Sequence, residues 1–268
     1  MSLGVYKCMK LKLIPLFLLL LGSTAFAEGD LDLAEVKPTP LALQVGEELE
    51  YSLRWSMFKV ASGYLRVHPN VVIDGIDCHH VSLRVVSNSF ADVFYKVRSE
   101  FHSYISVEHQ RVVRYRVEQH EGDTHRDATI RFDWENKTAN YQRDGEDPQD
   151  DVEIGTYTWD PLSVVYYFRH FINGPFEMVT LPATDGKKYL GIDIKYLGQE
   201  NLEVQLGEFD SYKIEPNTKE MKGVFEKSKN SKIKMWYSND EYRYPLLIKS
   251  KVIVGSFIAE LKKVRVIQ

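Results

Sequence analysis

The residues best suited to metal chemistry stand together in the segment Asp77-Cys78-His79-His80. Thiolate and imidazole are the ligands that zinc and copper prefer in proteins. In an extended strand, however, Cys78 and His80 point to one side and His79 points to the other. A metal site needs three or four converging ligands. We therefore interpret the segment as a buried cysteine with histidines at a sheet edge, and we predict no metal site and no cofactor.

Three other groups of residues have simple structural explanations. The acidic run DGEDPQDD at 144–151 lacks the alternating ligand spacing of a calcium-binding loop, which favours a solvated loop. Asp160 and Ser163 have the types and spacing of residues that cap the start of a helix. The four tryptophans, Trp55, Trp134, Trp159 and Trp236, are interpreted as core residues rather than as a binding surface.

Strong catalytic motifs are absent from the sequence. It contains no G-x-S-x-G, no H-E-x-x-H, no G-x-x-x-x-G-K and no dinucleotide-binding fingerprint. No reaction and no catalytic residue can be assigned, and we expect a binding or structural role rather than an enzymatic one.

The N-terminus has the three parts of a secretory signal. Lys7, Lys10 and Lys12 precede an apolar run over 13–21, and Ala25-Phe26-Ala27 forms a small-residue cleavage site. A bilayer-spanning helix needs roughly 20 apolar residues, and this run is shorter and contains Pro15. We predict cleavage after Ala27, export to the periplasm, and no membrane anchor in the mature chain.

Charge and cysteine content narrow the class of protein further. Residues 1–27 contain three lysines and no acidic residue, so their removal would change the formal net charge from −4 to −7. This balance argues against nucleic acid as a partner, because nucleic acid demands a basic face. Cys78 would be the one remaining cysteine, which excludes an internal disulfide. Stability must therefore come from an apolar core.

The elements that must position any site are mostly strands. Leu49, Tyr51, Leu53 and Trp55 alternate with polar residues, which predicts a half-buried strand. Similar alternations, separated by turn signals, predict an antiparallel meander; they occur at 65/67, 81/83/85, 93/95/97, 113/115/117, 128/130/132/134, 192/194/196, 202/204/206, 212/214 and 233/235/237. Residues 28–45 carry two prolines without a sustained period, and we expect an extended leader there.

One helix is predicted from about Asp160 to Ile172. Asp160 can cap it, Pro161 suits its first turn, and Gly174-Pro175 ends it. With about a dozen strands and one helix, the sheet must curl or fold back on itself. The predicted fold is all-β and mainly antiparallel: a strongly curved sheet or partly open β-barrel with one helix packed on it, in a single domain over 46–268.

The segment 235–261 reads as two strands with a turn between them, and the second carries apolar residues on both faces. Leu246, Ile248 and Ile258 share one face, whereas Leu247 and Phe257 lie on the other. Gly255 in the last strand permits a sharp bend or a close backbone approach. The second apolar face is covered either by the protein itself or by something that the protein binds, and the sequence leaves both alternatives open.

Four segments together resemble a known family: GEELEYSLRWSMFKVASGYLRV, DPLSVVYYFRHF, LGEFDSYKIEP and KMWYSNDEYRYPLLIKSKVIVGSFIAEL. In this order they resemble the bacterial exported family called domain of unknown function 3108, over roughly 46–261. The most specific positions are the helix start and the closing hairpin, namely Asp160, Pro161, Leu162, Ser163, Trp236, Ser238, Asp240 and Pro245. The connection SMFKV after Trp55 departs from the family, in which more glycine is common.

This resemblance implies a compartment and an architecture, because the family has no established activity. Its layout is similar to the half-open barrels of periplasmic lipoprotein carriers and envelope-stress sensors, which hold acyl chains between a curved sheet and helices. That similarity is an analogy of fold.

Three functions follow as hypotheses. The first is a periplasmic protein that binds a lipid or other apolar ligand in the concavity of the sheet. The second is a structural or interaction module that pairs with an envelope protein, and the third is a hydrolase of envelope polymers. For the first hypothesis, the predicted ligand-binding residues are two facing apolar stripes, one from the first strand and one from the helix: Leu49, Tyr51, Leu53, Trp55, Val164, Phe168 and Phe171. Packing of these stripes against each other as core is the alternative.

Overall fold

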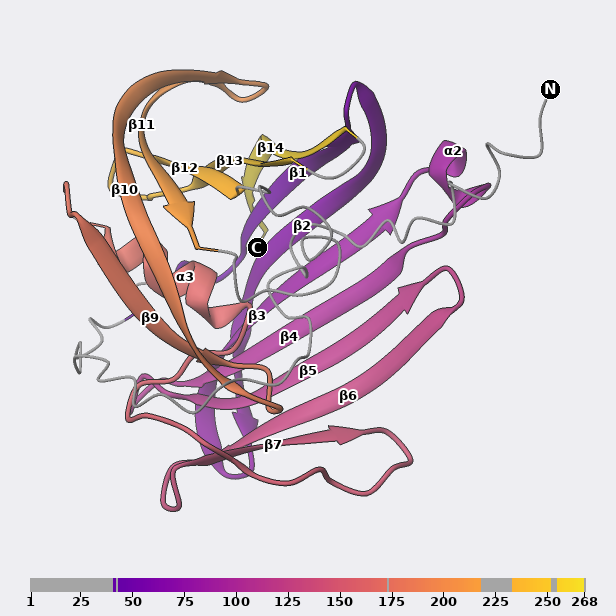
Figure 1. Ribbon diagram of the computed structural model, residues 1–268, viewed down its shortest axis with the longest axis vertical. Coiled ribbons are helices and arrows are strands. Elements are labelled where there is room, and N and C mark those ends of the chain that lie inside the picture. The colour runs from indigo at the N-terminus through magenta and orange to yellow at the C-terminus, as the bar shows by residue number, and fades with distance from the viewer. Residues whose placement is uncertain (1–40, 42, 173, 218–232, 252–254, 268) are drawn as a thin grey trace.

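The computed structural model describes residues 41, 43–172, 174–217, 233–251 and 255–267. The described residues form fourteen strands and two helices (Figure 1). The strands are β1 (Glu47–Trp55), β2 (Phe58–Ile73), β3 (Ile76–Ser87), β4 (Arg98–Ser106), β5 (Val112–Glu121), β6 (Thr124–Asp133), β7 (Thr138–Arg143), β8 (Val152–Glu153), β9 (Met178–Thr184), β10 (Tyr189–Val204), β11 (Gly207–Pro216), β12 (Ile233–Ser238), β13 (Pro245–Lys251) and β14 (Ser256–Val266). The helices are α2 (Ser89–Asp92) and α3 (Ser163–Phe171).

All fourteen strands belong to one antiparallel sheet. Their order is β8-β7-β6-β5-β4-β3-β2-β1-β14-β13-β12-β11-β10-β9, so β1 and β14 join the two halves of the chain at the middle of the sheet. The sheet curves strongly but is not closed into a barrel. The segment between β8 and α3 reaches the β9 edge, where Trp159 forms a bridge with Ala183 and the Trp159 backbone N donates to Pro182 O at 3.0 Å. The prediction of a strongly curved, partly open sheet is confirmed.

Helix α3 lies inside the curve of the sheet (Figure 1). Residues 163–169 are all buried, so the helix is covered on every side and not only along one stripe. Asp160 Oδ1 accepts hydrogen bonds from the backbone N of Leu162 and of Ser163, at 2.7 and 3.0 Å. The predicted capping role of Asp160 is therefore confirmed, although Pro161 and Leu162 form a turn and the helix itself begins at Ser163.

The first strand is buried on both faces, which corrects the prediction of a half-buried strand. Leu49 and Tyr51 face the core, as the alternation predicts. Glu48 and Glu50 on the other face are also buried, because cations cover them: Arg66 and Arg265 pair with Glu48, and Lys262 lies 2.7 Å from Glu50. Ion pairs with neighbouring strands thus replace the solvent that the polar residues were expected to meet.

A second ion pair fastens α3 to the sheet from the inside. The Arg169 guanidinium binds both carboxylate oxygens of Glu47, at 2.7 and 2.9 Å, and it also donates to Tyr242 O. Both side chains are almost fully buried. A bidentate pair with further hydrogen bonds is the arrangement that makes a buried charge tolerable.

The protein itself covers part of the second apolar face near the C-terminus. Leu246, Leu247 and Ile248 are all buried, although they alternate between the two faces of β13. Glu260 lies opposite Leu247, and its Oε1 accepts from the backbone N of Gln205 at the β10–β11 turn, at 3.0 Å. The β10–β11 hairpin, which arches over the top of Figure 1, therefore folds back across this face.

The alternation Val93/Tyr95/Val97 does not form the predicted strand. Residues 89–92 form the four-residue helix α2, and only Val97 forms an isolated bridge, with Glu121. Asn88 starts the helix, because its side-chain oxygen accepts from the Ala91 backbone N at 2.9 Å. This local hydrogen bond favours a helical turn over continuation of the strand.

Several predicted features lie outside the described residues: the signal sequence 1–27, the leader up to residue 40, and positions 252–254. Gly255 is described, with a φ of +87°, but it lies before β14 and not within a strand. The single long strand predicted across Gly255 is therefore wrong: β13 and β14 pair with each other, and this pairing places Ile258 on the face of Leu247. In the part of the chain that the structure describes, no helix has the length and apolar character needed to span a membrane.

Candidate functional site

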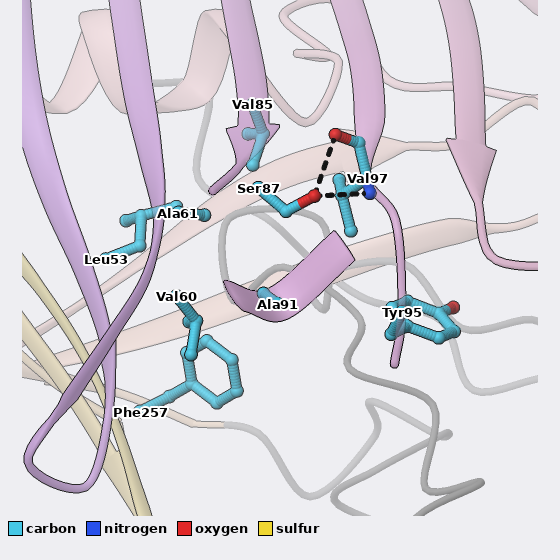
Figure 2. Close-up of a pocket in the computed structure, with 9 residues that line it drawn as sticks. All are labelled: Leu53, Val60, Ala61, Val85, Ser87, Ala91, Tyr95, Val97 and Phe257. Atoms are coloured by element: carbon cyan, nitrogen blue, oxygen red, sulfur yellow. Dashed lines mark hydrogen bonds between the residues drawn. The ribbon is translucent and has the colours of Figure 1, made fainter. Parts of the chain in front are cut away.

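A small apolar cavity lies beneath α2, at the end of the sheet where β1 meets β2 and β3 leads to β4 (Figure 2). Its volume is about 20 Å³. Nine residues line it: Leu53, Val60, Ala61, Val85, Ser87, Ala91, Tyr95, Val97 and Phe257. All except Tyr95 are buried, and Ser87 is the one polar side chain among those eight. The lining therefore suits a hydrocarbon group and offers little to a polar one.

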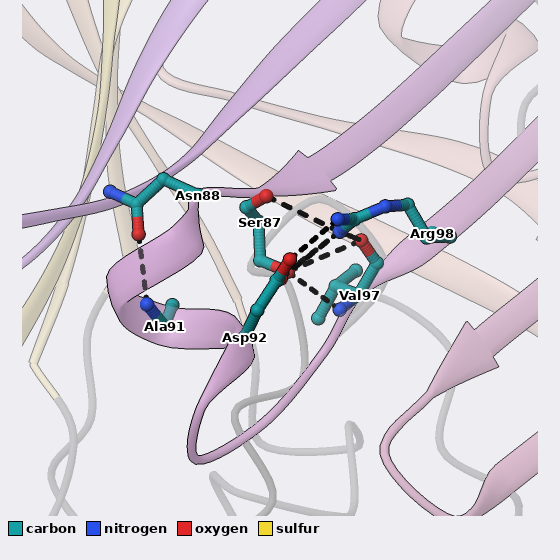
Figure 3. Close-up of polar contacts among 6 residues, drawn as sticks. All are labelled: Ser87, Asn88, Ala91, Asp92, Val97 and Arg98. Carbon is teal, nitrogen blue, oxygen red and sulfur yellow. Dashed lines mark hydrogen bonds and ion pairs between the residues drawn. The ribbon is translucent and has the colours of Figure 1, made fainter.

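Polar contacts at the edge of this cavity hold α2 in place (Figure 3). Arg98 at the start of β4 forms two contacts with the Asp92 carboxylate, Nη2 to Oδ2 at 2.6 Å and Nη1 to Oδ1 at 3.1 Å. The Ser87 hydroxyl donates to Asp92 Oδ1 and accepts from the Val97 backbone N at 2.7 Å. We call Ser87, Asp92 and Arg98 the latch, because they join α2 to the ends of β3 and β4.

The other end of α2 is attached to β2. The Asn88 backbone N donates to Val60 O at 2.9 Å, and its side-chain amide donates to Lys59 O at 2.7 Å. Within the helix, Ala91 is the one buried residue. Because a single methyl group connects α2 to the core, the hydrogen bonds of Asn88 and the latch carry most of its attachment.

Three ionisable side chains on or near α2, those of Asp92, Tyr95 and Glu121, have pKa values shifted from their ordinary values. Hydrogen bonds from Arg98 and Ser87 lower the pKa of Asp92, so its carboxylate is charged at neutral pH. Burial raises the pKa of Tyr95 to about 12. Burial also raises the pKa of Glu121 to about 7, and Gly122 N donates to Lys96 O at 2.8 Å beside it. Glu121, whose pKa is close to neutral pH, therefore lies next to the loop that follows α2.

Large apolar side chains are exposed just outside the cavity. Met57 and Phe58 lie at the β1–β2 turn, and Phe90, Val93 and Phe94 lie on α2 and directly after it. Their exposed fractions run from 49% for Phe94 to 82% for Met57. The rings of Phe58 and Phe90 stack with centroids 6.3 Å apart, and Phe90 meets Phe94 edge-on at 5.7 Å. We call these five residues the apolar tip.

The structure divides the seven predicted ligand-binding residues between two places. Leu53 lines the cavity under α2. Leu49 and Tyr51 are buried in the core near α3, with Val164 and Phe168 of the helix also buried.

Two of the seven are only partly buried, Trp55 and Phe171, and both pack against the core. Phe168 meets Tyr237 edge-on with centroids 5.3 Å apart, and the Tyr51 hydroxyl donates to Pro245 O at 2.8 Å. A ligand wall at α3 stays a prediction, whereas the contacts there are those of side chains packed on one another.

Cys78, His79 and His80 each contact a different neighbouring residue. The Cys78 thiol donates to Ile76 O at 3.4 Å, and burial raises its pKa to about 11. His79 Nδ1 lies 3.2 Å from Asn70 Oδ1, and His80 Nε2 lies 3.0 Å from His102 Nδ1. Among the described residues, no three His, Cys, Asp or Glu side chains are placed to hold a metal ion.

Asp160, three of the tryptophans and Asp144 of the acidic run make contacts within the protein. Asp160 is fully buried, and besides capping α3 it accepts from the Ser103 hydroxyl. Trp159 and Trp236 are buried, and Trp134 packs against the core and donates to Val112 O at 2.7 Å. In the acidic run, Asp144 binds Arg116 at 2.6 Å.

A larger groove, of about 300 Å³, lies on the opposite face of the sheet. Its lining is charged and includes Arg66, Arg84 and Arg265 together with Glu48 and Glu100. Glu48 pairs with two of these arginines, so much of the charge is already compensated within the protein.

Comparison with known proteins identifies the family. The model of a family described as "Protein of unknown function (DUF3108)" matches residues 50–262. The chain belongs to the DUF3108 family. None of the curated proteins matches this member of the family.

Solved structures show the same fold in a more distant protein. The DUF3108 chain is similar to a β-barrel-like protein of domain of unknown function DUF1849 from Brucella abortus, with a TM-score of 0.57 and 8% identity. That likeness covers 84% of this chain and 98% of the other. A protein of Bacteroides fragilis with a YmcC-like fold gives a TM-score of 0.35 at 10% identity, over 83% of this chain and 96% of that one.

Proposed function

We propose that this DUF3108 protein is exported to the periplasm through the signal sequence at 1–27, and that it binds the hydrocarbon part of a lipid or another apolar ligand beneath α2. The observation that carries the proposal is the apolar cavity, which lies against a single helical turn, with exposed phenylalanines on that turn and beside it in the chain. Apolar ligand sites are commonly concave, mostly apolar and placed at the mouth of β-barrels.

The size of the cavity determines how binding must occur. A volume of about 20 Å³ holds little more than one water-sized group. A hydrocarbon chain therefore enters only if α2 moves away from Leu53, Ala61 and Phe257. Helix α2 suits this movement because it is short, carries one buried methyl group, and is joined to the sheet mainly by polar contacts. In this proposal α2 is a lid and the latch keeps it closed.

A titration with a dansyl-labelled fatty acid tests binding. Dansyl emission should rise with the wild-type protein and saturate. Ala61→Leu fills the cavity from β2 and should weaken binding about tenfold or more, since overpacking leaves no space for the ligand. Ala139→Leu is the matched control, because Ala139 is also buried but lies on β7 and does not line the cavity. Equal affinity in wild type and Ala61→Leu, with both proteins folded, would refute binding at this site.

A cross-link tests the movement of α2 separately. In Phe58→Cys/Phe90→Cys, the new thiols replace rings that stack across the boundary between β2 and α2. A short bis-maleimide should join them and prevent fatty-acid binding, whereas capping each thiol with a single maleimide should leave binding intact. Cys78 is buried with a raised pKa and should not react. Undiminished binding by the cross-linked protein would show that α2 is not the lid.

A further inference from the structure

The apolar tip is a convergence of exposed side chains from separate parts of the chain. Met57 and Phe58 come from the β1–β2 turn, and Phe90, Val93 and Phe94 come from the segment that leaves β3. Single exposed apolar residues are ordinary on protein surfaces. A contiguous group with stacked rings marks a contact surface, because its exposure to water is unfavourable.

The residues around the tip point to a lipid surface as the partner. Exposed Lys59 and Lys96 flank the aromatic residues in sequence, each two or fewer residues from a phenylalanine of the tip. Arg98 pairs with the Asp92 carboxylate, and Asp123 on the β5–β6 turn is an exposed acid near Tyr95. Aromatic side chains bordered by lysines are typical of segments that lie in the interface of a bilayer. The chain as a whole has a net negative charge, which anionic lipid headgroups repel. The end that carries Lys59 and Lys96 is therefore the end favoured to face those headgroups.

The position of the cavity supports the same partner. Ala91 lines the cavity, and its neighbour Phe90 belongs to the tip, so adjacent residues of one helical turn take part in the two surfaces. In Figure 1, α2 and the β1–β2 turn stand at one end of the sheet, away from the β2–β3 turn. We propose that the apolar tip inserts into the surface of a lipid bilayer, so that an acyl chain passes between the bilayer and the cavity without crossing water. This inference rests on the proposed function for its ligand, but docking itself can be measured independently.

Vesicle sedimentation tests the docking. Protein purified from the periplasm is mixed with sucrose-loaded vesicles of phosphatidylethanolamine and phosphatidylglycerol, and the bound fraction is measured. Wild type should sediment with the vesicles. Phe58→Ser/Phe90→Ser/Phe94→Ser should reduce the partition coefficient at least about tenfold, because it removes three apolar side chains from the interface. All three side chains are about half exposed, so the variant should keep its fold, as circular dichroism can verify.

Two further variants make the test specific. Val72→Ser/Ile76→Ser removes exposed apolar residues at the β2–β3 turn, at the opposite end of the same strands, and should bind vesicles like wild type. Lys59→Glu/Lys96→Glu should weaken binding to vesicles with phosphatidylglycerol more than to vesicles of phosphatidylcholine alone. Absence of wild-type sedimentation, or equal sedimentation of the triple serine variant, would overturn the proposal. A wild-type dimer that the triple variant converts to a monomer would instead assign the tip to a second copy of the chain, and would overturn it too.

The two proposals fail in distinguishable ways. The triple serine variant should still bind the dansyl fatty acid in free solution, because the cavity lining is unchanged. If fatty acid binds but vesicles do not, the docking inference is wrong and the proposed function stands. If vesicles bind and fatty acid does not, the docking stands and the proposed function is wrong.

Discussion

Asp92 on α2 and Arg98 on β4 are joined by two contacts, the shorter of them 2.6 Å between Arg98 Nη2 and Asp92 Oδ2. The chain between them carries Val93 and Phe94, two residues of the apolar tip. A single ion pair thus closes the loop that follows α2 and carries part of the apolar tip. The pair is partly exposed, because the Arg98 side chain is 38% exposed and that of Asp92 is 26% exposed, so it contributes little to stability.

Loss of the latch should loosen α2 without unfolding the sheet. In Asp92→Asn the ion pair with Arg98 is lost, and a partly exposed pair contributes about 0.2–1 kcal/mol. The backbone amides of Asp92, Phe94 and Tyr95, which donate within this loop, should exchange with deuterium about two- to fivefold faster. Arg143→Ala is the control, because it breaks another exposed ion pair, with Glu146. Unchanged exchange in Asp92→Asn would show that the pair does not restrain the lid.

Glu121 should make stability depend on pH near neutrality. Its folded-state pKa is raised to about 7 by burial, so the folded protein holds a proton that the unfolded chain releases at lower pH. The protein should therefore lose stability as pH rises from about 4.5 to 7, by on the order of 2–3 kcal/mol.

Urea unfolding at pH 5 and pH 8 measures this effect. Glu121→Gln should remove most of the decline and be more stable than wild type at pH 8, because a neutral amide replaces the buried charge. Glu108→Gln, at an exposed position, serves as the control. An identical decline in wild type and Glu121→Gln would contradict the assignment.

The buried pair between Glu47 and Arg169 should be costly to break. In Glu47→Ala the Arg169 guanidinium stays buried without its partner, and such losses cost about 3–5 kcal/mol. Glu47→Leu/Arg169→Met removes both charges and should recover much of the loss, since two apolar residues leave no unpaired ion. Thermal or urea unfolding of the three proteins measures the difference. A loss below about 1 kcal/mol in Glu47→Ala would mean that solvent reaches Arg169.

Phe168→Ala separates core packing from ligand binding at α3. If Phe168 only packs against Tyr237 and its neighbours, truncation should lower the free energy of unfolding by about 3–5 kcal/mol. Fatty-acid affinity per folded molecule should then stay unchanged, because the cavity under α2 is intact. A small loss of stability with a large loss of affinity would place the ligand between β1 and α3 instead.

Sequence patterns predicted the architecture because the determinants of that architecture are local. The alternation at Leu49, Tyr51 and Leu53 and the capping group Asp160 each act within a few residues, and the structure contains the strand and the helix that they indicate. The burial of Glu48 was not predicted, because its partners Arg66 and Arg265 come from other strands. The pairing of Glu47 with Arg169 is a contact of the same kind, across 122 positions.

The candidate site was largely missed for a related reason. Val93, Tyr95 and Val97 alternate like a strand, and this pattern concealed the helical turn just before them. Asn88 followed by Ser-Phe-Ala-Asp is the local signal that could have revealed α2, since asparagine favours the position before a helix. The cavity joins Leu53, Ala91 and Phe257, and only the folded chain brings them together.

Native mass spectrometry of the protein purified from the periplasm tests ligand binding beneath α2 most directly. Wild type should carry a non-covalent lipid that is released on denaturation, whereas Ala61→Leu from the same host should show the bare protein mass. A bare mass for wild type, with a known lipid-binding protein retaining its ligand under the same conditions, would contradict the account. Equal lipid in wild type and Ala61→Leu would contradict the assignment of the site.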